Sequence, residues 1–165
     1  MVNKIDRARV IARLAHTGQK YGSADYFRYH VENVVRRCEE NKHCTYGIIE
    51  VAYLHDILED TKVTADDLDM LGVTPDAVRS VELLTHVTGT YAEYVQGIVD
   101  SGDLTAAFVK FHDLIENRYN CMSIANGYAD PMSRNRSRSL LVRYEKALTT
   151  LRGADLYHLY EDGQS

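Results

Sequence analysis

Ala52-Tyr53-Leu54-His55-Asp56-Ile57-Leu58-Glu59-Asp60-Thr61 places four ionisable side chains within six positions at the end of an apolar run. In a helix that begins near Cys44, these four share i,i+3 and i,i+4 relations and crowd one sector of the last turns. They are His55, Asp56, Glu59 and Asp60. Carboxylates without partners in an apolar surround cost several kcal/mol. The cluster therefore lies at the surface, in a paired network or around a metal ion.

The composition indicates one globular domain. The chain has 165 residues, of which 45% are hydrophobic and 26% are charged, and this is enough to bury a core. We expect the domain to cover residues 1–153 and a C-terminal tail to cover 154–165. A formal net charge of -5 disfavours nucleic-acid binding through the overall field. The expected partner is a small molecule, and the oligomeric state is left open.

Cysteine usage and hydropathy predict a cytoplasmic protein. Cys38, Cys44 and Cys121 form an odd set without CxxC spacing, which is typical of reduced thiols. No apolar run reaches the roughly 18 residues that span a bilayer. The first residues also lack the apolar segment of a signal peptide. We therefore expect no contact with a membrane.

Helical periodicity runs through most of the chain, and only Pro75 and Pro131 add proline breaks. We predict an all-α fold, a compact single-domain bundle of about seven to nine helices. The segment 120–132 contains Gly127 and Pro131, which favours a mobile loop near a site. The expected helices cover residues 4–20, 26–41, 44–60, 64–71, 75–85, 90–99, 104–122 and 133–152.

His55-Asp56 is the leading candidate for a site, although His112-Asp113 shows that such a pair alone carries little weight. The first pair differs because two acids follow one turn later and because His30 lies on the inner face of the preceding helix. Two imidazoles and two carboxylates suit a first-row divalent ion such as Mn²⁺, Fe²⁺ or Zn²⁺. The alternative is that His55 is a hydrogen-bonded core histidine beside ordinary helix-end charges.

Several other catalytic motifs are absent from the sequence. It contains neither a Walker-type nor a dinucleotide-type glycine-rich loop, no Gly-x-Ser-x-Gly elbow and no HExxH motif. No cysteine has a histidine partner in its sequence context. Among enzymes, a metal-dependent hydrolase is the class that remains.

Three blocks of the sequence carry a resemblance to a known family. They are Ala15-His16-Thr17-Gly18-Gln19 with His30 fourteen positions after His16, then Tyr53 to Thr61, and finally Val109 to Asn117. In this order they resemble the HD-domain metal-dependent phosphohydrolases, in particular the small stand-alone alarmone hydrolases of the RelA/SpoT type. The resemblance implies an HD-type helical domain that hydrolyses a phosphorylated nucleotide, with removal of the 3′-pyrophosphate of (p)ppGpp as the leading case.

The resemblance also implies roles for individual residues of this chain. One divalent ion would be bound, Mn²⁺ in the first place, with Fe²⁺, Zn²⁺, Mg²⁺ or Co²⁺ as alternatives. Its ligands would be His30, His55, Asp56 and Asp113. Glu59 and Asp60 would be catalytic and act on the attacking water and the phosphate. The substrate contacts would be Lys20, His16 and Asn117.

Two positions depart from the alarmone-hydrolase pattern. Tyr21 stands where that family has an arginine, and Leu114 follows the fourth ligand where a cation is common. Both concern recognition of the substrate. Three functions therefore stay open: alarmone hydrolysis, a deoxynucleoside 5′-monophosphatase or other nucleotide phosphatase of the same superfamily, and a non-catalytic helical binding module.

Overall fold

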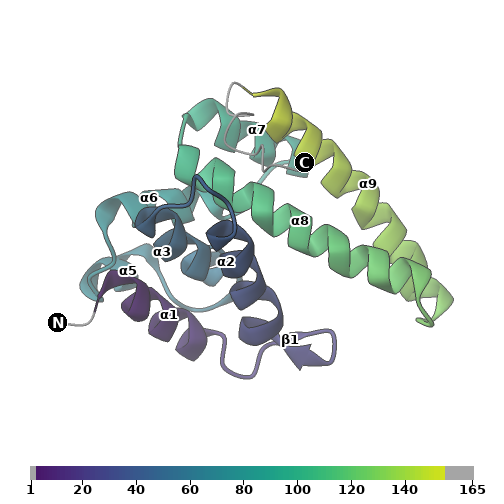
Figure 1. The fold of residues 1–165 in the computed structure, drawn as a ribbon, viewed down its shortest axis with the longest axis horizontal. Coiled ribbons are helices and arrows are strands. Elements are labelled where there is room, and N and C mark those ends of the chain that lie inside the picture. Colours follow the sequence, from purple (N-terminus) through teal and green to yellow (C-terminus); the bar gives the residue numbers. More distant parts are fainter. Residues whose placement is uncertain (1–2, 155–165) are drawn as a thin grey trace.

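The computed structural model describes residues 3–154, which form a bundle of helices with one short hairpin (Figure 1). The α-helices are α1 (Lys4–Ala15), α2 (Glu32–Glu39), α3 (Tyr46–Leu54), α4 (Ile57–Asp60), α5 (Ala65–Met70), α6 (Pro75–Leu84), α7 (Tyr91–Ser101), α8 (Leu104–Asn126) and α9 (Pro131–Gly153). The hairpin pairs β1 (Lys20–Tyr21) with β2 (Ala24–Asp25), and a π-helical turn, η1 (Phe27–Val31), leads into α2. The prediction of an all-α bundle is confirmed. The predicted tail lies outside the described residues except for Ala154.

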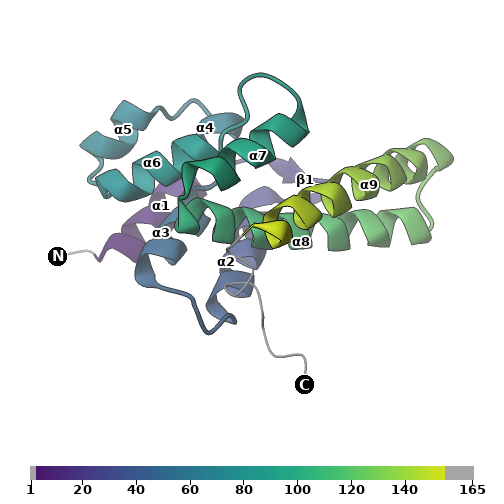
Figure 2. The same ribbon diagram turned by 90° about the horizontal axis from the view of Figure 1, so that it is seen from above.

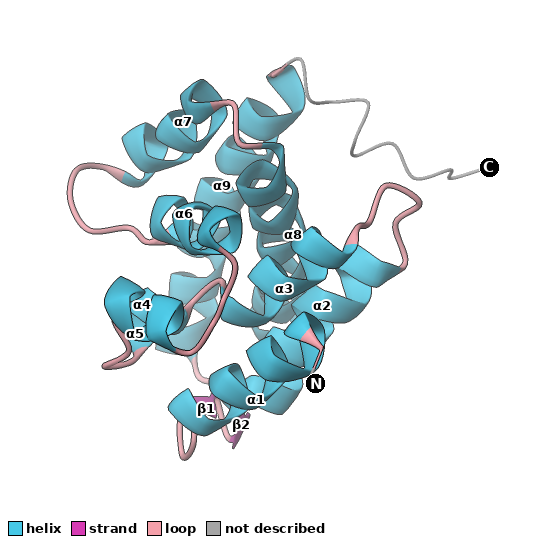
Figure 3. Cartoon of the chain, turned by 90° about the vertical axis from the view of Figure 1, so that its left-hand side faces the viewer, coloured by secondary structure: helices cyan, strands magenta, loops and turns pink. Residues whose placement is uncertain are grey.

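Helix α3 forms the centre of the bundle. It contacts α1, α2, α6 and α8, which lie around it in Figure 3. Every residue from Ile48 to Leu54 is buried. Because neighbours cover this helix all round, its residues are apolar on every face, with Glu50 as its one charged residue. Among residues 3–154, no helix combines the length and the apolar character needed to cross a membrane.

Helices α8 and α9 pack side by side as an antiparallel hairpin, whose closed end extends beyond the other helices (Figures 1 and 2). The predicted loop over 120–132 is wrong, because α8 continues to Asn126 and α9 begins at Pro131. Asp130 caps α9 by accepting a hydrogen bond from the backbone N–H of Ser133, and Pro131 occupies the first turn. This Asp-Pro start signal marks the true boundary.

The first helix is shorter than predicted. Helix α1 ends at Ala15, His16 is its C-cap, and Gly18 has a φ of 82° in the left-handed region that favours glycine. The following residues turn back as the β1–β2 hairpin, in which Lys20 pairs with Asp25. The predicted helix over 4–20 is therefore wrong in its last turn.

The predicted helix over 44–60 is interrupted within the stretch that carries the candidate site. Helix α3 ends at Leu54 and α4 begins at Ile57, and Asp56 has φ −105° and ψ 1°, which is not helical. In an unbroken helix, adjacent side chains point about 100° apart. The break changes this relation, so His55 and Asp56 can turn toward the same point.

Glu50 is a buried carboxylate that joins α3 to the start of α6. It is 0% exposed and accepts hydrogen bonds from the backbone N–H and the hydroxyl of Thr74, at 3.2 and 2.9 Å. We expect Glu50→Ala to lower the free energy of unfolding by about 3 kcal/mol, because the Thr74 donors lose their partner and a cavity opens. Urea unfolding followed by circular dichroism measures the loss. The exposed Glu82→Ala is the control, and equal stability of the two variants would contradict the assigned role.

Candidate metal centre

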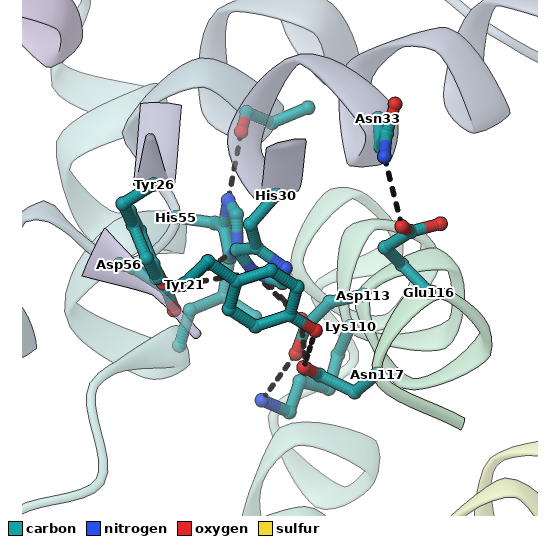
Figure 4. Close-up of polar contacts among 12 residues, drawn as sticks. Tyr21, Tyr26, His30, Asn33, His55, Asp56, Lys110, Asp113, Glu116 and Asn117 are labelled. Carbon is teal, nitrogen blue, oxygen red and sulfur yellow. Dashed lines mark hydrogen bonds and ion pairs between the residues drawn. The ribbon is translucent and has the colours of Figure 1, made fainter. Parts of the chain in front are cut away.

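Four side chains from separate segments converge on one point at the centre of the bundle (Figure 4). His30 comes from η1, His55 and Asp56 come from the break between α3 and α4, and Asp113 comes from α8. Each offers one ligand atom, and these atoms all lie within 4.8 Å of one another. The structure thus brings together the four residues that were predicted to bind a metal.

The distances within this group are short. His55 Nε2 lies 2.9 Å from Asp56 Oδ2, and His30 Nε2 lies 3.2 Å from the same oxygen. Asp113 Oδ1 is 3.3 Å from His30 Nε2. The two imidazole Nε2 atoms are themselves 3.2 Å apart. One face of the group therefore gathers two ring nitrogens and two carboxylate oxygens, which are the donor atoms that first-row divalent ions accept.

The orientation of His55 fits a metal ligand. Its Nδ1 lies 2.8 Å from the carbonyl oxygen of Ala52, which can only accept a hydrogen bond. Nδ1 therefore carries the proton, and Nε2 presents a lone pair to the group. A hydrogen bond from the far ring nitrogen to a backbone carbonyl is the usual way in which proteins orient a metal-binding histidine. The residues present fit a divalent ion.

The pKa shifts within the group also favour a bound divalent ion. Burial alone lowers the pKa of His30, but hydrogen bonds to Asp113 and Asp56 outweigh it and raise the pKa to about 10. Burial raises the pKa of Asp113, yet Lys110 and His30 lower it to about 2. The carboxylates of Asp56 and Asp113 thus stay ionised and need a positive charge beside them. A divalent ion supplies that charge in place of protons on the imidazoles.

A shell of hydrogen bonds holds the two carboxylates in place. Lys110 Nζ donates to Asp113 Oδ2 at 2.8 Å, and Asn117 Nδ2 donates to Asp113 Oδ1 at 2.6 Å. The Tyr26 hydroxyl donates to Asp56. Burial and the neighbouring Asp56 raise the pKa of Tyr26, so this phenol keeps its proton. The carboxylates are oriented before any ligand arrives.

Glu59 and Asp60 lie on α4 beside the group, and both carboxylates are exposed and line the same cavity. Glu59 Oε2 accepts a hydrogen bond from the backbone N–H of His86 at 3.1 Å. Asp60 Oδ2 accepts one from Gln19 Nε2 at 2.8 Å. Each carboxylate is therefore held by a neutral donor, and among residues 3–154 no ion pair joins either of them to a cation.

The cavity over these residues has a volume of about 190 Å³. Several residues of its wall have no place in the site that was predicted from the sequence. Lys110 contributes a cation, with Nζ 5.8 and 5.3 Å from the ring centroids of two tyrosines on α7. The other unassigned wall residues are Tyr26, His86, Tyr91, Tyr94, Arg143 and Tyr144. Tyr91 and Tyr94 are spaced i,i+3 and share a helix face. No sequence motif marked His86.

Neither a protein-family model nor a curated protein sequence matches this chain. Its structure does match solved structures, among them that of a metazoan orthologue of SpoT, a protein that hydrolyses ppGpp. The match has a TM-score of 0.73 and covers 93% of this chain and 88% of the other, at 21% sequence identity. The chain therefore shares its fold with that SpoT orthologue. The resemblance of the three sequence blocks is therefore confirmed at the level of the fold.

Within the SpoT-type fold, only one of the three predicted substrate contacts lies in the cavity wall. Asn117 does so. Lys20 is exposed on β1 and is not part of the wall. His16 is 1% exposed and packs behind Tyr26, with the two ring centroids 5.0 Å apart. The structure therefore does not bring Lys20 or His16 to the place where a substrate would meet the metal centre.

The other His-Asp pair of the chain divides its two residues between different environments. Asp113 joins the metal centre, whereas His112 packs against Phe108, with their ring centroids 4.7 Å apart. Burial, and then the charge of Arg37, lower the pKa of His112 to about 4. His112 is thus a neutral core histidine. Leu114, the next residue, is 0% exposed and belongs to the core rather than to the cavity.

Tyr21 occupies the place of an arginine in the alarmone-hydrolase pattern, and its hydroxyl donates to Asn117 Oδ1 at 3.0 Å. Its ring also lies against His30, with a centroid distance of 5.0 Å. We expect Tyr21→Phe to lower kcat/KM by about 3- to 10-fold, because Asn117 loses one of the bonds that orient it. Metal content should stay unchanged. Steady-state kinetics with elemental analysis tests this, and a loss of metal instead would show that Tyr21 supports the ligands directly.

Proposed function

We propose that this chain is a metal-dependent phosphohydrolase that acts on a phosphorylated nucleotide, with removal of the 3′-pyrophosphate of ppGpp as the leading case. The observation that carries the proposal is the His-His-Asp-Asp group in a fold shared with a protein that hydrolyses ppGpp. The adjacent pair of unneutralised carboxylates supports catalysis over mere binding, because a passive metal site has no use for them.

The four converging side chains would hold the ion, Mn²⁺ in the first place, with Fe²⁺, Zn²⁺, Mg²⁺ or Co²⁺ as alternatives. When bound, such an ion supplies Lewis-acid chemistry, which lowers the pKa of water and polarises a phosphoryl oxygen. Tyr26, Lys110 and Asn117 keep the carboxylate ligands fixed, so little reorganisation is needed during the reaction.

Glu59 and Asp60 would handle the proton of the attacking water. Both face the cavity, and each is held by a single neutral donor, His86 N–H or Gln19 Nε2. A carboxylate held in this way can accept a proton or orient a water molecule. The role proposed for Glu59 is general base, and Asp60 would orient the water or the reacting phosphate.

The size of the cavity bears on the substrate. Ligand sites for whole small molecules usually measure about 300–1,000 Å³, whereas this cavity measures about 190 Å³. It therefore suits one phosphorylated end of a nucleotide. A second cavity of about 290 Å³ between α7 and α9 shares Tyr91 and Arg143 with the first. The remainder of the nucleotide would extend into this groove, with Arg143 between the two parts.

The alternative, a deoxynucleoside 5′-monophosphatase or related nucleotide phosphatase, has support from two positions near the site that lack the expected cations. Tyr21 and the buried Leu114 replace two cations that the alarmone-hydrolase pattern would provide. A substrate with fewer phosphates needs fewer cations, so these replacements favour a less charged nucleotide.

Product analysis separates the possibilities. Purified chain loaded with Mn²⁺ is incubated with ppGpp and with a panel of nucleoside 3′- and 5′-monophosphates. Release of pyrophosphate and GDP from ppGpp is the expected result. Release of inorganic phosphate from the 5′-monophosphates alone would support the alternative. Turnover of none of these substrates by metal-loaded protein would contradict both and favour a binding module.

A further inference from the structure

A second polar cavity lies on the other side of η1, against the C-terminal end of α1. Its volume is about 620 Å³, and it shares no lining residue with the cavity over the metal centre. This volume is within the range of about 300–1,000 Å³ that is usual for sites of small-molecule ligands. The cavity is thus large enough for a nucleotide-sized molecule and separate from the proposed reaction site.

Three guanidinium groups line this cavity, from Arg9, Arg13 and Arg28, against two carboxylates, from Asp25 and Glu32. Arg9 Nη2 is paired with Glu32 Oε1 at 2.9 Å, and Asp25 Oδ1 accepts the backbone N–H of Arg28 at 2.9 Å. Both carboxylates therefore already have partners. Among residues 3–154, no ion pair joins the guanidinium groups of Arg13 or Arg28 to a carboxylate.

Backbone acceptors at the end of α1 are also occupied. The backbone N–H of His16 donates to the Ala12 carbonyl, and the backbone N–H of Thr17 donates to the Leu14 carbonyl. The Thr17 hydroxyl donates to the Arg13 carbonyl at 3.1 Å. These carbonyls are therefore satisfied within the chain. The guanidinium groups of Arg13 and Arg28 therefore remain available to a ligand, and their N–H groups match the oxygens of a phosphate group.

A buried ring nitrogen of His16 without a hydrogen-bond partner is an independent indication that this cavity binds a ligand. It lines the cavity, is 1% exposed, and its Nε2 has no hydrogen-bond partner among the described residues. Its Nδ1 lies 2.7 Å from Gln19 Oε1, and Gln19 Nε2 faces the Asp60 carboxylate, so the amide oxygen must accept and His16 Nδ1 must donate. Nε2 is left as a lone-pair acceptor. Buried polar atoms without partners are rare and costly, and a P–OH group that reached this atom would satisfy it.

We propose that this cavity is an effector site for a small phosphorylated anion, bound by Arg13 and Arg28, which acts on the metal centre through His16. Two contacts provide the connection. His16 donates to Gln19, which donates to Asp60, and the His16 ring packs against Tyr26, whose hydroxyl donates to Asp56. A ligand that moves His16 therefore shifts a carboxylate in the cavity wall and a residue of the metal group. Binding itself does not depend on the proposed hydrolysis.

Nuclear magnetic resonance of the full chain labelled with ¹⁵N tests the site, with inorganic pyrophosphate and ADP as separate probes in buffer without divalent metal. We expect saturable shifts of the backbone amides of Thr17, Gly18 and Arg28. Arg13→Gln combined with Arg28→Gln should weaken binding at least about tenfold, because two charge-assisted contacts are lost. Both side chains are exposed, and the dispersion of the same spectra reports that the fold is retained.

The matched control is Arg36→Gln combined with Arg79→Gln, which removes the same charge from exposed positions outside both cavities. Equal weakening in the control, or shifts confined to Glu59, His86 and Asn117, would overturn the proposed site. The tighter of the two probes identifies the ligand as a free or a nucleoside-linked diphosphate.

The connection has its own test. Gln19→Leu breaks the contact to Asp60 without removing a charge. In the unmutated chain, pyrophosphate should also shift the Asp60 amide. In this variant, the pyrophosphate shifts at Thr17 and Gly18 should persist, while the shift of the Asp60 amide should disappear. An Asp60 shift that remains unchanged in Gln19→Leu would overturn the proposed route to the metal centre.

Discussion

Asp56→Asn is expected to reduce bound divalent metal from one equivalent per chain to a small fraction and to lower metal affinity by more than about 100-fold. Mutations that only remove a partner of a metal ligand cost about 10- to 100-fold, and Asp56 is itself a member of the group. Its Oδ2 lies 2.9 Å from His55 and 3.2 Å from His30, so the change removes the negative charge at the point of convergence. Hydrolysis should be lost together with the metal.

The measurement is metal content after dialysis, by elemental analysis, with calorimetric titration of Mn²⁺. Asp69→Asn, at an exposed position of α5, provides the control for loss of one carboxylate. The amide keeps the size of the side chain, so unfolding of the variant should not confuse the result, and circular dichroism checks this. Full metal occupancy in Asp56→Asn would show that Asp56 is not a ligand, and absence of bound metal from the unmutated chain would show that the group is a hydrogen-bonded core cluster rather than a metal site.

Glu59→Gln is expected to leave metal content unchanged and to lower kcat by about 10²- to 10⁴-fold, the usual range for loss of a general base. The glutamine keeps the length of the side chain, and its carbonyl oxygen can still accept the His86 N–H that Glu59 accepts at 3.1 Å. The change thus removes the ability to take a proton and little else. Together with Asp56→Asn, this variant separates binding of the metal from catalysis.

Steady-state kinetics on the best substrate of the product screen measures the effect, and Glu82→Gln on the exposed face of α6 is the matched control. A variant that keeps full kcat would assign the proton-accepting role to Asp60, which faces the same cavity, and Asp60→Asn should then show the loss. If both single variants and the double variant keep full kcat, the proposed chemistry of this carboxylate pair is wrong.

Local sequence signals sufficed to predict most helices. Thr64 and Thr90 form capping boxes with Asp67 and Glu93, and each starts the helix that the pattern predicted. Errors arose where geometry rather than composition decides. The break after Leu54 falls at His55 and Asp56, and neither residue type by itself ends a helix, so the sequence does not mark where the helix stops.

For the site, the four converging side chains could be predicted from the resemblance, because each lies in a short block with recognisable neighbours. The rest of the wall could not. Arg143 reaches the cavity from α9, and His86 reaches it from the connection before α7, so their contributions depend on tertiary packing alone. Lys20 follows the first block in sequence, but it lies exposed on the hairpin and outside the cavity wall, so its contact with a substrate stays a prediction.

The π-helical turn η1 gives this domain a length requirement that substitution experiments alone would not reveal. A π-helical turn holds one residue more than the corresponding α-helical turn, and η1 carries His30 while Tyr26 lies just before it. Removing any one residue from Phe27–Val31 would let the chain close into an ordinary α-helix and rotate everything before it relative to α2. Tyr26 would then lose its position beside Asp56. In protein engineering, this segment should therefore accept exchange of the exposed Tyr29 but no deletion.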